Sequence, residues 1–305
     1  MNQTPDSTGR QRGDDSAGEQ DGPRRHLHND QHQAAFELSE QERDEVEDKL
    51  PPRVQVLHET IRVQGKAELK RSATALGWSA LSAGLSMGFS MLASGLLASH
   101  LGTDAGHELI VMLGYPVGFV IVILARQQLF TENTMTAVLP VMTRPSWRAL
   151  LFLLRLWLIV LVGNLVGVAL FAYGAVHLGM FDESAFRAFT GLGHKLMENP
   201  AGGMFAKGIV AGWLIATMVW LVPAAQNARV WIIVGMTYLI ALGNFTHIIA
   251  GSTEVLFLVF SGQLSFADYV WPFALPTLAG NIVGGSLIFA LISHAQVRSD
   301  VYSAD

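Results

Sequence analysis

Residues 129–132 (LFTE) interrupt a long hydrophobic stretch in the first half of the chain, and residues 244–247 (NFTH) interrupt another in the second half. Each break is followed one hydrophobic span later by an echo, residues 163–167 (GNLVG) and residues 280–284 (GNIVG). The offset between the two breaks is close to the offset between the two echoes. Polar breaks at corresponding places of two repeated halves indicate a binding site near the middle of a bilayer. The pattern predicts a membrane channel or transporter.

Composition separates a polar N-terminal segment from a membrane domain. Of the 305 residues, 50% are hydrophobic and only 15% are charged, and more than half of the charges precede residue 72. The absence of cysteine excludes disulfides and cysteine-ligated metals. No nucleic-acid partner, cofactor or metal is indicated. We expect residues 1–38 to be a disordered tail, because this segment has too few apolar side chains to form a core.

Two short helices are expected between this tail and the membrane, within residues 39–71. Ser39 and Glu42 form a capping-box pattern for a charged helix that ends before Pro51. An amphipathic pattern then predicts a helix at the cytoplasmic membrane surface. Six spans of about 20 or more residues are expected within residues 72–295, followed by a tail at 296–305. These spans are placed at 72–98, 109–142, 147–178, 204–223, 230–261 and 271–295.

The charges in the connections predict how the chain is oriented. Lys and Arg gather before the first span and in the connections that follow the second, fourth and sixth spans. This distribution predicts that both termini are cytoplasmic. Each half has three spans, so the second half enters the membrane from the opposite side. The expected fold is an all-α membrane protein of two inverted three-helix repeats, in which spans two and five are broken.

The breaks hold side chains that suit a solute pathway. Backbone that leaves the helical form inside a membrane must be buried in protein or line a cavity, and helix N-termini favour small anions. His247 has an ordinary pKa near physiological pH, and Thr131 at the matching break is expected to hydrogen-bond it. Leu129, Phe130 and Phe245 flank the same point and are candidates for a hydrophobic constriction.

Three charged side chains lie near the breaks. Arg126 either contacts an anion, pairs with Glu132 or extends to the cytoplasmic edge. Glu132 and Glu254 either take part in proton movement or are paired or hydrated in the vestibules. Thr246 lies beside His247 and is a further candidate for the solute pathway.

Several segments together resemble a known family over roughly residues 55 to 300. They are 129–131 (LFT), 163–167 (GNLVG), Lys195, 205–209 (FAKGI), 244–247 (NFTH) and 280–285 (GNIVGG). The chain resembles the formate/nitrite transporter family, most closely its YfdC-like inner-membrane branch. The resemblance implies an aquaporin-like fold in a homopentamer of the bacterial inner membrane, surrounded by lipid. It also implies that the chain is not an enzyme and moves small monovalent anions, often with protons.

The resemblance also implies roles for single residues. His247 matches the central pore histidine of the family, and Thr131 matches its partner. Leu129 and Phe130 match residues of the cytoplasmic constriction. Three other roles are implied: Asn164 and Asn281 match asparagines that line the pore, and Lys195 matches a lysine that attracts anions at the outer entrance. Thr246 stands where the family usually has Glu, which implies a different arrangement for handling protons.

Other functions agree with parts of the same sequence. A neutral-solute channel similar to aquaporins would use His247 as a polar lining group. A regulatory membrane protein without transport would use the acidic N-terminal tail as its working part. A membrane enzyme or metal protein would use His247 with Glu132 or Glu254, although two carboxylates and one histidine are a thin ligand set for a transition metal.

Overall fold

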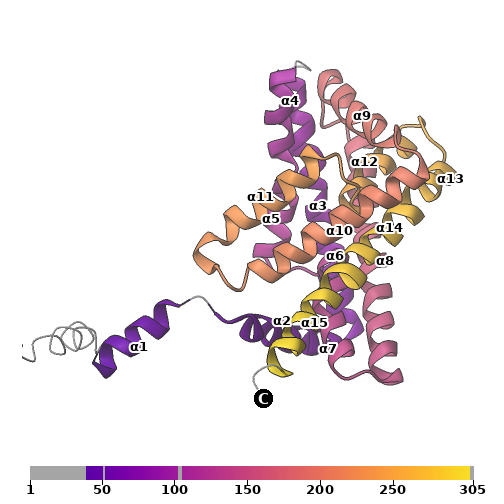
Figure 1. The fold of residues 1–305 in the computed structure, drawn as a ribbon. Helices are drawn as coiled ribbons and strands as arrows, with labels where there is room; N and C mark the ends of the chain where they lie inside the picture. Colours follow the sequence, from indigo (N-terminus) through magenta and orange to yellow (C-terminus); the bar gives the residue numbers. More distant parts are fainter. Residues whose placement is uncertain (1–38, 51, 102–104, 303–305) are drawn as a thin grey trace, which may run out of the picture. The chain divides into compact units, whose positions relative to one another are not determined.

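The computed structural model describes residues 39–50, 52–101 and 105–302 (Figure 1), and every regular element among them is a helix. The expectation of disorder for residues 1–38 falls outside the described residues, as does the end of the expected C-terminal tail at 303–305. The chain forms two units, Met1–Pro51 and Pro52–Asp305, which are described separately.

The described part of the first unit is the helix α1 (Glu40–Lys49). The amide of Ser39 donates to the Glu42 carboxylate at 2.9 Å, and the Glu42 amide donates to the Ser39 hydroxyl at 3.3 Å. These reciprocal bonds satisfy two amide groups that have no partner within the helix. The capping box and the charged helix expected from the sequence are confirmed.

The second unit contains the remaining helices. Its first half comprises α2 (Val54–Leu69), α3 (Ala73–Leu101), α4 (Ala105–Val111), α5 (Pro116–Leu124), α6 (Phe130–Thr136), α7 (Val138–Thr143), α8 (Trp147–His177) and α9 (Glu183–Met197). Its second half comprises α10 (Ala201–Leu221), α11 (Arg229–Leu242), α12 (Ile248–Phe260), α13 (Phe266–Asp268), α14 (Leu275–Ile282) and α15 (Leu291–Tyr302). Short 3-10 turns join α4 to α5 and precede α11, and π-helical segments flank α14. Within this unit, α4 and α9 lie at one end, and α2, α7 and α15 lie at the other (Figure 1).

Five helical segments among the described residues are long and apolar enough to cross a membrane. They are Ala73–Leu101, Gly106–Leu124, Trp147–His177, Ala201–Leu221 and Phe266–Ser299. The stretches expected as spans two and five are each divided, because residues 125–129 separate α5 from α6 and residues 243–247 separate α11 from α12. Helix α9 was not expected, since it lies in the connection between the expected spans 147–178 and 204–223.

Small residues bring the helix backbones close together. A Cβ atom at Gly167 of α8 would lie 2.7 Å from the Cα of Gly84 in α3 and 2.5 Å from a carbonyl oxygen of α3. In the second half, a Cβ atom at Gly280 of α14 would lie 2.9 Å from the Cα of Gly208 in α10. Such contacts are typical of tightly packed membrane helices. They place the side chains of α8 and α14 beside the two breaks.

Helix α2 contacts α15 through a pair of histidines. Its His58 Nε2 is 3.0 Å from Nδ1 of His294 in α15, which joins the first and last helices of this unit. Burial lowers the pKa of His58 below its ordinary value, and the nearby His294 lowers it further. A hydrogen bond between two imidazole rings needs at least one free nitrogen, so the lowered pKa favours this contact at neutral pH.

Candidate functional site

The two breaks begin with the same helix-ending turn. Arg126 and Asn244 occupy matching places and have positive φ angles of 54° and 47°. In both breaks the amide of the next residue donates to a carbonyl five residues earlier, at 2.9 Å. This bond is the signature of a C-terminal cap with one left-handed residue. Asn adopts this conformation readily, whereas Arg rarely does, so the turn at Arg126 is imposed by its surroundings.

Two asparagines hold the breaks in place. The Oδ1 of Asn164 accepts the amide of Phe130 at 2.9 Å, and its Nδ2 donates to the carbonyls of Gln128 and of a residue in α3 at 2.9 and 2.8 Å. Asn281 repeats this arrangement: it accepts the amide of Ile248 at 2.9 Å and donates to carbonyls of the second break and of α10 at 2.9 and 2.8 Å. Each asparagine therefore caps the helix that follows the break.

Both asparagine side chains are completely buried, and neither lines either of the two cavities described below. Each amide group uses its oxygen and its nitrogen on backbone partners that would otherwise be unsatisfied inside the fold. Asn164 and Asn281 therefore position the helices α6 and α12, and their pore-lining role stays a prediction.

His247 lies between the two breaks and is 1% exposed. Its Nε2 is 2.7 Å from the Thr131 hydroxyl, so the hydrogen bond expected from the sequence is present. Its Nδ1 accepts the amide of Ala250 at 3.2 Å, which caps α12, and its ring packs edge-to-face on Phe119 with centroids 5.1 Å apart. A nitrogen that accepts a backbone amide carries no proton, so the neutral ring with its proton on Nε2 satisfies both contacts.

Two cavities approach this histidine region from opposite ends of the unit. The cavity beside α2, called the α2-side cavity, has a volume of about 450 Å³ and is lined by Gln64, Glu68, Arg126, Gln128, Glu132 and Arg229, among others. The cavity beside α9, called the α9-side cavity, has a volume of about 100 Å³ and is lined by Glu108, Tyr115, Lys195, Phe245, His247 and Glu254, among others. The two cavities share none of their lining residues.

Side chains between the cavities are packed. Leu129 and Phe130 are buried, and Phe130 meets Trp157 edge-to-face with centroids 5.8 Å apart. Leu129 and Phe130 line neither of these two cavities, whereas Phe245 is half-buried and lines the α9-side cavity. Thr246 is buried and donates its hydroxyl proton to the carbonyl of Met204 at 2.7 Å, which places it outside both cavities. Leu129 and Phe130 are therefore packed outside both cavities, Phe245 lines the α9-side cavity, and Thr246 faces α10. The constriction stays a prediction.

Charges in the α9-side cavity are partly compensated. Lys195 forms an ion pair with Glu108, and both side chains are about half exposed, at 48% and 46%. Glu254 lines the same cavity and is half-buried, and it has no hydrogen-bond or ion-pair partner among the described residues. The structure therefore places Lys195 at this cavity, as expected, but with a carboxylate beside it.

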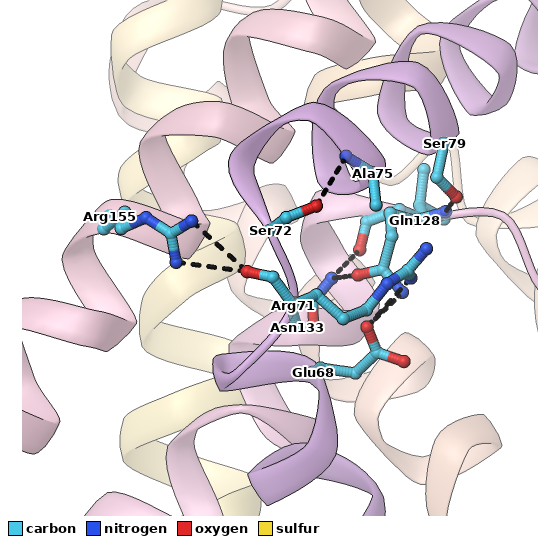
Figure 2. A network of polar contacts seen from close by, with 9 residues as sticks. Glu68, Arg71, Ser72, Ala75, Ser79, Gln128, Asn133 and Arg155 are labelled. Atoms are coloured by element: carbon cyan, nitrogen blue, oxygen red, sulfur yellow. Dashed lines mark hydrogen bonds and ion pairs between the residues drawn. The ribbon is translucent and has the colours of Figure 1, made fainter.

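A polar network that the sequence analysis missed anchors α2 at the α2-side cavity (Figure 2). Glu68 pairs with Arg71 at 3.0 Å and accepts Nε2 of Gln128 at 3.0 Å, and the Gln128 oxygen accepts Nδ2 of Asn133 at 3.0 Å. The amide of Gln128 also donates to the Ser79 hydroxyl at 3.1 Å. Gln128 precedes the constriction residue Leu129, so the network connects the surface helix to the first break.

Arg126 and Glu132 line the same α2-side cavity without pairing. Within the described parts of the chain, Arg126 has no carboxylate within 4 Å. The interpretation of an Arg126–Glu132 ion pair is therefore wrong, and Arg126 extends to the exposed side of the cavity. Among the described residues, no three His, Asp or Glu side chains are close enough to share a metal ion.

Comparison with known proteins settles the family. The family model described as "Formate/nitrite transporter" matches residues 55–295. The chain belongs to the formate/nitrite transporter family. The "Inner membrane protein YfdC" of Escherichia coli (strain K12) is 51% identical over 278 residues, which are 89% of this chain and 90% of that protein. The "Formate channel BtFdhC" of Bacillus thuringiensis is 25% identical over 56% of this chain and 66% of that protein.

Solved structures of the formate/nitrite transporter family share the fold. A "Pentameric formate channel with formate bound" matches with a TM-score of 0.62 at 20% identity, over 75% of this chain and 98% of the other. An "FNT family ion channel" matches with a TM-score of 0.66 at 21% identity, over 79% of this chain and 98% of the other. The family predicted from the duplicated motifs and the all-helical, multi-pass membrane fold are confirmed. The six inverted spans stay a prediction.

Proposed function

We propose that this member of the formate/nitrite transporter family is a channel or transporter for small monovalent weak-acid anions, such as formate or nitrite, and that passage is linked to protons through His247. The observation that carries the proposal is the hydrogen bond between His247 and Thr131, which lies between two separate cavities. Family members include proteins described as formate channels, which supports this class of solute.

The architecture belongs to the same proposal. We infer that α5 with α6 and α7 forms the second of six spans, that α11 with α12 forms the fifth, and that the two three-span halves are inverted. The Lys and Arg residues just before the first expected span, in the connections after the second and fourth spans, and at Arg298 support cytoplasmic termini, so the α2-side cavity is the inner vestibule and the α9-side cavity is the outer vestibule. The channel domain covers residues 72–295, between the interfacial helices at 39–71 and the tail at 296–305.

Assembly and location follow from the relatives. A solved relative is described as pentameric, and the 51% identical relative is named an inner membrane protein. We propose a homopentamer in a bacterial inner membrane, with one pore in each protomer and lipid around the assembly. Helix α8 supports a membrane setting, since it exposes Leu151, Leu158 and Leu170 along its length.

The route through the protomer follows from the site geometry. Lys195, although paired with Glu108, supplies the cation at the outer vestibule, and the N-terminus of α12 directs partial positive charge toward the break. An ion that leaves water for the packed region at Leu129 and Phe130 loses its hydration, which is costly. A weak-acid anion avoids this cost by taking a proton and crossing as the neutral acid. His247 supplies a hydrogen bond or a proton at the barrier.

Uptake into liposomes at two pH values tests this function. With formate, acetate, lactate, nitrite and hydrosulfide offered in turn, we expect at least one weak acid to enter faster through the reconstituted protein at the lower pH. Chloride, the anion of a strong acid, should not enter. A neutral-solute channel would instead pass glycerol at a rate that does not change with pH. The absence of any uptake would favour the regulatory alternative and contradict the proposal.

A further inference from the structure

The α9-side cavity contains an acidic side chain, Glu254, that has no counter-ion among the described residues. Glu254 lies on α12, two helical turns after His247, and both residues line the α9-side cavity. The carboxyl group is half-buried and has no partner among the described residues. Unpaired carboxyl groups inside a membrane protein are costly and are functional candidates for that reason.

The other charged and titratable groups of this cavity leave Glu254 without a counter-ion. They are Glu108, Lys195, Tyr115 and His247. The Lys195 charge is compensated by Glu108, so an ionised Glu254 would make the vestibule net negative and repel an anion. A neutral carboxyl does not repel the anion, and it holds a proton that can be transferred. An unpaired charge away from bulk water is unfavourable, which favours this neutral form.

Both ring nitrogens of His247 are engaged, so of the two roles proposed for this residue the contacts favour the hydrogen bond at the barrier. Its Nε2–H is used on Thr131, and its Nδ1 accepts the Ala250 amide. A proton added to Nδ1 would break the cap of α12. The neighbouring Thr246 offers no acid, because its hydroxyl bonds the Met204 carbonyl.

We propose that Glu254 donates the proton that neutralises the weak-acid anion in the outer vestibule, an assignment that rests on the proposed function. The O–H bond of the Glu254 carboxyl breaks as an O–H bond forms on the anion, which leaves a Glu254 carboxylate and a neutral acid. The neutral acid then moves toward His247 and Thr131. The carboxylate takes a new proton from a hydronium ion of the outer solution, so one proton crosses with each anion.

Two substitutions of the same kind in the same vestibule separate proton donation from simple charge. Glu254→Gln and Glu108→Gln each remove one carboxyl group and keep the side-chain volume. With formate as the probe and pH values one unit apart, we expect E254Q to lower initial uptake about tenfold at the higher pH. Without the Glu254 donor, the uptake rate follows the concentration of neutral formic acid in solution, and this concentration falls about tenfold per pH unit. E108Q frees Lys195 and should raise uptake. Glu254→Asp, which keeps the acid, should recover part of the loss.

The outcomes distinguish the inference from the function on which it rests. If E254Q raises uptake as E108Q does, or leaves it unchanged, Glu254 acts only through its charge or not at all, and the inference is wrong while the proposed function stands. If the wild-type protein takes up no weak acid, the proposed function itself fails. Infrared spectra of the purified protein give a readout without transport: the difference between the wild-type and E254Q spectra at neutral pH should contain a band of a protonated carboxyl, and the absence of this band from the difference would overturn the assignment.

Discussion

Replacing His247 with alanine is expected to abolish pH-dependent weak-acid uptake while the protein still assembles. The substitution removes the Nε2 contact to Thr131, the polar link that lies at the barrier between the two cavities. If this hydrogen bond lowers the barrier by about 1.4 kcal/mol, its loss slows passage about tenfold. Initial uptake rates in liposomes of matched protein content measure the change.

Two further variants show whether the loss comes from the barrier or from the fold. His247→Asn keeps a good helix cap for the Ala250 amide but is too short to reach Thr131, so it should also lose uptake and keep its assembly. His177→Ala removes an exposed histidine of α8 and should transport normally. Size-exclusion chromatography in detergent reports assembly. Normal uptake by the alanine variant at both pH values would remove His247 from the mechanism.

Replacing Asn164 or Asn281 with leucine is expected to destabilise the protein strongly and by similar amounts. Each asparagine satisfies one backbone amide and two backbone carbonyls in the interior. Leucine has a similar branched shape but is larger and leaves these groups unpaired, at a cost of about 1–3 kcal/mol for each group that finds no other partner. Thermal unfolding of the purified protein and the yield of assembled protein measure the loss.

Equal losses of stability are expected at Asn164 and Asn281, whereas an asparagine elsewhere should tolerate the same substitution. Asn199 is half-buried and makes one local bond to a carbonyl of its own helix end, so Asn199→Leu should change the unfolding midpoint little. A large loss for Asn164→Leu with none for Asn281→Leu would contradict the equal capping roles of the two residues. Unchanged stability in both would mean that the breaks are held by other contacts.

Features that depend on neighbouring residues or on duplicated motifs could be predicted from the sequence. Ser39 and Glu42 define the start of α1 because a capping box needs only residues three apart, and the repeated segments around Thr131 and His247 identify the family. Helix α9 was missed because it is too short to span a membrane. Its apolar residues Ala185, Phe189, Gly193 and Leu196 recur at helical spacing and were the available signal.

Partners that are distant in sequence could not be predicted. Asn164 caps Phe130 across 34 residues, and Lys195 pairs with Glu108 across 87 residues. Such pairs depend on how the helices pack, and neither residue type indicates its partner. The left-handed turn was foreseeable at Asn244, a residue that favours it, but not at Arg126, where packing overrides local preference.

We infer that the two vestibules open to opposite sides of the membrane and are separated at His247 and Thr131. Because the chain has no cysteine, single cysteines introduced at Ala241 in the outer vestibule and at Thr136 in the inner vestibule test this claim directly with a membrane-impermeant thiol reagent. We expect Ala241→Cys to react only from the outside and Thr136→Cys only from the cytoplasmic side, with the buried control Ala216→Cys unreactive from both. Reaction of both vestibule positions from the same side, or of either one from both sides, would contradict the account.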